Sequence, residues 1–263
     1  MGKVLFVYKF ICYKLFAKHK KGFGVHSPFV FNLLTKVIEN NNQYYAFDSI
    51  ELLKQKLLDN QKTISVTDYG AGSTKLKNNI RKISEIARIS SQKEKYGRLL
   101  FRLVEHFKPE QILELGTSLG IGTLYLAMPN SNSTLYTIEG CLEIAAVAKE
   151  NFKQLNVENI QLLVGRFDEQ LPKLLKEVSK LDFVFFDGNH RKEPTLNYFE
   201  QCLPLAHENT VFVFDDIHWS KEMYEAWQII CNSNRTVVCV DLFFMGLVFF
   251  KKGIPKQNFV INF

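Results

Sequence analysis

A glycine-rich stretch at residues 114–122 has the composition of a turn that holds a ligand; it reads ELGTSLGIG. Glycine lets the backbone approach a ligand closely and adopt angles that other residues disfavour. The stretch follows a short apolar run and precedes a helical pattern, and a helix N-terminus presents unpaired backbone N–H groups. It therefore predicts a cofactor-binding turn, with contacts from Gly116, Thr117, Ser118, Gly120 and Gly122.

Two carboxylates indicate which cofactor this turn holds. Glu139 ends the next apolar run and is followed by Gly140, which is where a carboxylate binds the hydroxyls of a ribose. Glu114, at the end of the preceding run, repels a pyrophosphate but favours a ligand with an ammonium and a sulfonium group. The glycine spacing is GxxxGxG and not the GxGxxG of dinucleotide sites. Together these residues predict S-adenosylmethionine, which carries both cations and no phosphate.

Acids and histidines follow two later apolar runs, where they are placed for chemistry on an acceptor. Methyl transfer is an in-line displacement, so the protein aligns a nucleophile and removes its proton. One route is Mg²⁺ or another divalent cation held by oxygen ligands; the other is a histidine base. We expect the ligands of the first route to be Asp187, Asp215 and Asp216, and the bases of the second to be His190 or His218.

Each of these side chains also has a plainer interpretation. His190 can bond within its own loop, and His218 can cap the helix that follows it. Trp219, Phe243 and Phe244 either line an aromatic substrate pocket or pack in the core. The sequence leaves both interpretations open.

The elements that position these residues alternate from residue 109 onward. Apolar runs typical of strands buried on both faces occur at 111–115, 135–139, 160–165, 181–187, 210–216, 236–242 and 247–252. Helical patterns separate the first five runs, which predicts parallel βαβ units. Only residues 243–246 separate the last two runs, so that pair must be antiparallel. We therefore predict a Rossmann-like α/β fold: a seven-stranded, mostly parallel sheet with a terminal antiparallel hairpin and helices on both faces.

The first part of the chain has a different pattern. Segments such as 49–58 and 93–107 carry apolar residues at helical spacing. We predict a helical N-terminal extension or cap over 1–88 and a cofactor-binding domain over 89–263. A second glycine cluster at 68–73 is a rival nucleotide loop, a loop that closes over the site, or an ordinary surface turn.

Charge is concentrated at the start of the chain. The formal net charge is +6, and residues 1–40 carry seven lysines against Glu39 alone. A neutral remainder argues against a broad nucleic-acid-binding face on the main domain. The basic leader, residues 1–21, either packs an apolar stripe on the body or contacts a membrane surface, an acidic partner or RNA. A homodimer is a further expectation.

The cysteines and the hydropathy indicate an intracellular protein. Five cysteines, odd in number and widely spaced, predict reduced buried thiols. No apolar stretch reaches the roughly 18 residues of a membrane span, and the leader lacks a signal-peptide cleavage pattern. We expect a cytoplasmic enzyme.

Several motifs in residues 89–252 resemble the class I methyltransferases, particularly the small-molecule O-methyltransferases of the catechol and caffeoyl-CoA types. The resemblance rests on ILELGTSLGIGT, YTIEG, VGRFDE, DFVFFDGNH, VFVFDDIHW and the final GLVFFKK, together with residues 89–100 before them. It implies S-adenosylmethionine as cofactor and a small hydroxylated, phenolic acceptor.

The resemblance also implies roles for individual residues. Glu114, Gly116 and Gly120 would hold the methionine part, Glu139 the ribose, and Arg166, Phe167 and Asp168 the adenine surroundings. Asp187 would lie beneath the transferring methyl group. In the catechol type, two aspartates and an asparagine bind magnesium; Asp187 and Asp215 match the aspartates, but Asp216 replaces the asparagine.

Three alternatives remain beside a small-molecule O-methyltransferase. An RNA or protein methyltransferase would use the basic leader to recruit its target, although an NPPY-type motif for amino methylation is absent. A non-catalytic binding protein would keep the fold without the reaction. An aminopropyl transferase would share the fold.

Overall fold

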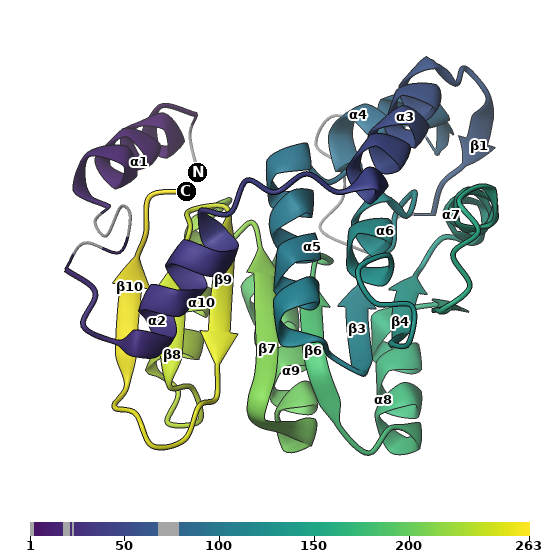
Figure 1. The fold of residues 1–263 in the computed structure, drawn as a ribbon. Helices are drawn as coiled ribbons and strands as arrows, with labels where there is room; N and C mark the ends of the chain where they lie inside the picture. Colours follow the sequence, from purple (N-terminus) through teal and green to yellow (C-terminus); the bar gives the residue numbers. More distant parts are fainter. Residues whose placement is uncertain (1–2, 18–21, 23, 68–78) are drawn as a thin grey trace. The chain divides into compact units, whose positions relative to one another are not determined.

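The computed structural model describes residues 3–17, 22, 24–67 and 79–263. They form two compact units, one of residues 42–179 and one that joins residues 1–41 to residues 180–263. Figure 1 labels the helices and strands of each unit. The rival glycine cluster at 68–73 lies outside the described residues.

Three parallel strands form the sheet of the 42–179 unit. They are β3 (Gln111–Leu115), β4 (Thr134–Glu139) and β5 (Ile160–Val164), with β4 in the middle. The register pairs Leu115 with Ile138, and Glu139 with Val164. Because the strands are parallel and in register, their carboxyl ends meet at one edge, where the predicted cofactor residues lie.

Helices follow each of these strands. They are α6 (Ile121–Ala127), α7 (Leu142–Gln154) and α8 (Phe167–Glu177). All of α6 is buried, as expected for a short apolar helix packed between other elements. The amide of Asn151 on α7 donates to the carbonyl of Leu119 at 2.8 Å, which ties the glycine turn to the neighbouring helix.

Three more helices and a short hairpin precede β3 in this unit. They are α3 (Tyr45–Asp59), α4 (Ile83–Ser90), α5 (Glu94–Phe107), and antiparallel β1 (Thr63–Ser65) with β2 (Ile80–Lys82). Gly97 brings α5 against α6: a Cβ there would lie 2.3 Å from the ring of Tyr125. The ring of Phe47 on α3 contacts Phe101 on α5 with centroids 4.9 Å apart. Aromatic packing therefore holds α3, α5 and α6 together.

The second unit contains the remaining strands, in the order β10, β8, β9, β7, β6. Their bounds are β6 (Leu181–Phe186), β7 (Ala206–Asp215), β8 (Val238–Asp241), β9 (Met245–Phe249) and β10 (Gln257–Val260). β6 and β7 are parallel, whereas β9 is antiparallel to both β7 and β8. Helices α9 (Lys192–Cys202) and α10 (Lys221–Asn232) and the 3-10 turn η3 (Leu203–Leu205) complete this part.

The start of the chain packs on the last strands of the same unit. Figure 1 shows α2 (Pro28–Leu33), in purple, beside the yellow strands, although the two segments stand at opposite ends of the sequence. The π-helical turn η2 (Leu34–Ile38) continues α2. The ring of Phe29 contacts that of Phe249 at 5.0 Å. In α1 (Lys3–Phe16), the hydroxyl of Tyr13 donates to the carbonyl of Ile261.

The predicted fold class is confirmed. All seven predicted strands are present, and the last two of them, β8 and β9, pair antiparallel. The structure adds β10, which sequence reasoning missed because alternate side chains of this short strand are only half-buried. The hairpin of β1 and β2 was also not predicted. A domain boundary at residue 88 stays a prediction; residues 1–41 and 42–88 belong to different units.

Candidate functional site

The glycine turn after β3 contains three residues with left-handed backbone angles. The φ values are +110° at Gly116, +48° at Ser118 and +84° at Gly120. The backbone N–H of Gly116 donates to the carbonyl of Ile138 at 3.1 Å, which joins the turn to the end of β4. A Cβ at Gly120 would lie 2.4 Å from the ring of Phe152, so there is no room for a side chain. The positive φ of this residue also favours glycine.

Glu114 is completely buried beneath this turn. Its Oε2 accepts hydrogen bonds from the hydroxyls of Thr123 at 2.5 Å and Thr137 at 2.6 Å. Its Oε1 has no hydrogen-bond partner among the described residues. Burial raises the pKa of Glu114 to about 7, although the two hydroxyls oppose the shift.

A chain of hydroxyl groups connects Glu114 to the turn. The hydroxyl of Thr137 donates to Glu114, and the hydroxyls of Thr117 and Thr137 lie 2.6 Å apart. Because the proton of Thr137 is already used, Thr117 must donate to Thr137. The buried carboxyl of Glu114 therefore orients the Thr117 hydroxyl through Thr137, and the Thr117 oxygen remains a hydrogen-bond acceptor. This arrangement suits a cationic ligand and does not suit a phosphate.

Glu139 lies at the carboxyl end of β4, half-buried, and is held by the backbone on both sides. Its Oε2 accepts from the N–H of Ser118 and its Oε1 from the N–H of Cys141, both at 2.9 Å. These two hydrogen bonds fix the plane of the carboxylate. A carboxylate accepts about four hydrogen bonds, so this orientation is compatible with binding a ribose diol. Gly140, which lies between Glu139 and Cys141 in the sequence, is also half-buried.

The turn after β5 contains Arg166, Phe167 and Asp168. The guanidinium of Arg166 donates to both oxygens of Asp168, at 2.9 and 2.7 Å. This hydrogen-bonded ion pair lowers the pKa of the exposed Asp168 carboxyl. Phe167 begins α8 and is half-buried. A role for these residues around an adenine stays a prediction.

The acids of the second unit stand where β6 and β7 end. Asp187 directly follows β6, Asp215 ends β7, and Asp216 follows it with φ +54°. His190 Nε2 lies 3.8 Å from Asp187 Oδ1. Within the part of the chain that the structure describes, no three His, Cys, Asp or Glu side chains form a group that would hold a metal ion. The three aspartates share an edge but do not converge as ligands, and a metal site there stays a prediction.

His218 forms a pair that the sequence did not reveal. Its Nε2 lies 2.8 Å from Oδ2 of Asp241, at the end of β8. The other oxygen of Asp241 accepts from the N–H of Phe243 at 2.8 Å, which fixes the carboxylate. His218 Nδ1 is buried and has no partner among the described residues. The one available signal for this pair was that Asp241 is an acid near the end of the apolar run 236–242.

Aromatic rings surround this pair. The ring of Phe243 stacks on His218 at 4.6 Å with an interplanar angle of 5°, and the ring of Tyr224 lies 4.8 Å away. Phe243 is fully buried, whereas Trp219 is half-exposed. Phe6 on α1 contacts Phe243 at 5.5 Å. The sequence left open whether Phe243 lines a substrate pocket or packs in the core; in the structure it packs in the core.

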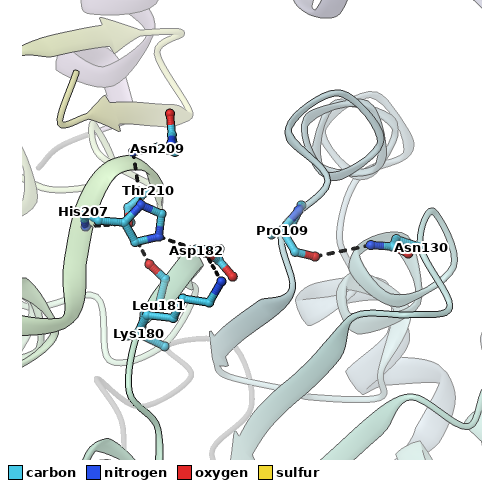
Figure 2. Close-up of polar contacts among 8 residues, drawn as sticks. All are labelled: Pro109, Asn130, Lys180, Leu181, Asp182, His207, Asn209 and Thr210. Atoms are coloured by element: carbon cyan, nitrogen blue, oxygen red, sulfur yellow. Dashed lines mark hydrogen bonds and ion pairs between the residues drawn. The ribbon is translucent and has the colours of Figure 1, made fainter. Parts of the chain in front are cut away.

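A second histidine–aspartate pair lies at the opposite ends of β6 and β7 (Figure 2). His207 Nε2 is 2.8 Å from Asp182 Oδ1, and its Nδ1 accepts from the N–H of Asn209 at 3.2 Å. Lys180 Nζ lies 3.5 Å from the same aspartate oxygen. Both nitrogens of His207 are thus engaged, in contrast to those of His218.

Comparison with known proteins finds similarity to methyltransferases. Residues 113–217 match the family of methyltransferase domains. A catechol O-methyltransferase of Niastella koreensis is 32% identical over 125 residues, which are 46% of this chain and 55% of that protein. One of Mycobacterium tuberculosis is 28% identical over 136 residues, 51% of this chain and 60% of that protein. The chain therefore spans little more than half the length of these curated relatives.

Solved structures share the fold. An O-methyltransferase from Bacillus cereus, solved in complex with SAH, superposes with a TM-score of 0.57 at 18% identity. The superposition covers 84% of this chain and 96% of that one. The family resemblance predicted from the motifs is confirmed.

Proposed function

We propose that this chain, whose residues 113–217 belong to the methyltransferase domain family, transfers the methyl group of S-adenosylmethionine to a hydroxyl of a small phenolic acceptor. The observation that carries the proposal is Glu139, whose carboxylate is fixed at a strand end by the backbone amide of Ser118 in the glycine turn and by that of Cys141. The names of the two catechol O-methyltransferase relatives and of the Bacillus cereus O-methyltransferase support it.

The turn region is assigned to holding the cofactor. Glu139 would accept hydrogen bonds from the ribose hydroxyls, as an ionised carboxylate in fixed orientation does well. The turn, with Gly116, Gly120 and Gly122, would approach the methionine part, while buried Glu114 stabilises its positive charge. When bound, S-adenosylmethionine supplies a methyl group on a sulfonium that leaves as a neutral thioether.

Protein side chains would then remove the proton of the acceptor hydroxyl. The Asp241 carboxylate orients His218 so that Nε2 donates to it, which leaves the lone pair of Nδ1 to take a proton. His190 with Asp187 is the second candidate base, with a longer separation of 3.8 Å. In this proposal His218 is the catalytic base and Asp241 its positioning residue.

A divalent metal on Asp187, Asp215 and Asp216 is the competing route. Oxygen ligands suit Mg²⁺, which would lower the pKa of a hydroxyl bound to it. The described side chains do not form a three-ligand group, so we assign the proton transfer to the histidine. A place for Asp187 beneath the transferring methyl group stays a prediction.

Other expectations on partners stay predictions. No described helix is long and apolar enough to cross a membrane. A homodimer, a cytoplasmic location, and an RNA or protein acceptor have no observation of this structure in their favour. Small phenols are the acceptor class that the names of the relatives favour.

The test is transfer of labelled methyl groups from S-adenosylmethionine to a panel of catechols and other phenols. We expect O-methylated product with at least one catechol, and turnover that survives a chelator. Turnover that stops with chelator and returns with Mg²⁺ would move the proton transfer to the aspartates. Cofactor binding without transfer to any hydroxyl would contradict the acceptor class.

A further inference from the structure

Helix α1 carries apolar side chains on both of its faces. Its inward face contacts the body of its own unit: Phe10 lies 5.0 Å from Phe243, and Tyr13 lies 5.1 Å from the same ring. Its outward face exposes half to three-quarters of five large side chains, Val7, Tyr8, Ile11, Leu15 and Phe16. A helix that is apolar all round is normally covered all round, so the outward face indicates a binding surface.

Lysines border this outward face. With 3.6 residues per turn, the five exposed positions 7, 8, 11, 15 and 16 form one broad apolar stripe over about half of the helix circumference, and positions 9 and 14 fall at its two edges. Lys9 Nζ lies over the Tyr224 ring at 4.7 Å. Lys14 Nζ donates to the Asn262 side chain at 2.7 Å. The two ammonium groups are therefore held at the rims of the apolar stripe.

The charge of the helix favours one class of partner. The helix contains three lysines and no acidic residue. A second copy of the same face would bring like charges together without a carboxylate from the helix to offset them. RNA would match the lysines but not the apolar stripe between them. An apolar stripe with basic rims is the pattern of helices that lie in the surface of an anionic membrane.

We propose that the outward face of α1 binds the surface of an anionic lipid bilayer, with the helix lying in the plane of the interface. The apolar side chains enter the boundary of headgroups and acyl chains, and the positive charge of the lysines at the edges of the face attracts the anionic surface. The proposal does not depend on methyl transfer, because it uses only the exposed side of the helix.

The experiment is cosedimentation of the full chain with vesicles. One set contains equal parts of phosphatidylcholine and phosphatidylglycerol, and the other contains phosphatidylcholine alone. The test variant combines Ile11→Glu with Leu15→Glu, at positions 50% and 72% exposed. The matched control combines Ile229→Glu with Leu52→Glu, at positions 47% and 61% exposed on other helices.

We expect the native chain to bind the anionic vesicles, more weakly at high salt and more weakly still to phosphatidylcholine alone. The α1 variant should bind at least about tenfold less, since each apolar side chain left in water costs roughly that factor. The control should bind like the native chain. A third variant, Ile11→Ala with Leu15→Ala, keeps the helix and should bind at an intermediate level.

Three results would overturn the proposal. The first is that the native chain stays in the supernatant with both kinds of vesicle. The second is that the α1 variants bind as well as the control. The third is self-association of the native chain in light scattering, lost in the α1 variants, without binding to lipid; the face would then belong to a second copy.

Discussion

Gly120 occupies its place in the turn for two separable reasons. Its φ is +84°, which L side chains adopt with strain, and a Cβ would also meet the Phe152 ring at 2.4 Å. Gly253 has a similar φ of +78°, but nothing lies within 4 Å of an added Cβ. Comparing an alanine substitution at Gly120 with one at Gly253 therefore separates the effect of backbone strain from that of steric exclusion.

We predict that Gly120→Ala lowers the free energy of unfolding by about 2–4 kcal/mol, the sum of strain and overpacking. Gly253→Ala should lower it by only about 1–2 kcal/mol, from strain alone. Urea unfolding measures both. Gly120→Ala should also weaken S-adenosylmethionine binding at least about tenfold, because the Phe152 ring and the turn must move apart. Equal effects of the two changes on stability and binding would contradict this account of the turn.

The raised pKa of Glu114 makes stability depend on pH. The folded state holds this proton up to about pH 7, whereas the unfolded chain releases it near 4.5. Between these values the folded state binds more protons, so the free energy of unfolding falls as the pH rises. A shift from 4.5 to about 7 corresponds to about 3 kcal/mol at 1.36 kcal/mol per unit.

We predict that Glu114→Gln removes this part of the pH dependence. The difference in unfolding free energy between native and variant should change by about 3 kcal/mol from pH 4 to pH 7.5, as measured by urea unfolding. Glu150→Gln, on the exposed side of α7, is the control and should leave the slope unchanged. A Glu114→Gln slope equal to the native one would show that this carboxyl ionises normally.

Among the described residues, the second unit contains two histidine–aspartate pairs with the same 2.8 Å separation. In the pair at the start of β6 and β7, His207 Nδ1 accepts a backbone N–H, so both nitrogens serve the fold (Figure 2). In the pair after β7 and β8, His218 Nδ1 has no partner. Of these two pairs, only that of His218 therefore leaves a ring nitrogen, Nδ1, whose lone pair can take a proton.

We predict that Asp241→Asn lowers kcat for methyl transfer by about 100-fold or more. The amide would donate to His218 Nε2 and place the proton on Nδ1, which removes the base. The limb of the pH–rate profile that reports the base should disappear, and S-adenosylmethionine affinity should stay unchanged. Asp182→Asn should cost about 1–2 kcal/mol of stability and leave kcat within about twofold.

Equal losses of kcat in Asp241→Asn and Asp182→Asn would show that the pair of His218 and Asp241 has a structural role and no catalytic one. An Asp241→Asn enzyme with native kcat would lead to the same conclusion and favour His190.

Periodicity predicted the strands and helices closely because their patterns are local. Continuous apolar runs placed β3 to β9 within a few residues of their observed bounds. β10 and the hairpin of β1 and β2 were missed, since short strands with half-exposed side chains carry little periodic signal. The pairing of His218 with Asp241 spans 23 residues and depends on tertiary packing, which no local pattern encodes.

At the scale of the whole molecule, the chain distributes the predicted residues over two units. Glu114, Glu139 and Arg166 lie in the 42–179 unit, and Asp187, Asp215 and His218 lie in the other. We expected all of these residues within one domain over 89–263, and predicted only that each lies at or just after a strand end. The inward contacts of α1 were not predictable in detail, since its apolar residues occur on both faces.

The most direct test of the central claim is calorimetric titration of the full chain with S-adenosylmethionine. We predict about one cofactor bound per chain. Glu139→Ala should weaken binding by roughly tenfold or more, because it removes hydrogen bonds to a charged group. Glu150→Ala should bind like the native chain. A native chain that binds no S-adenosylmethionine would contradict the assignment of the glycine turn and the reaction built on it.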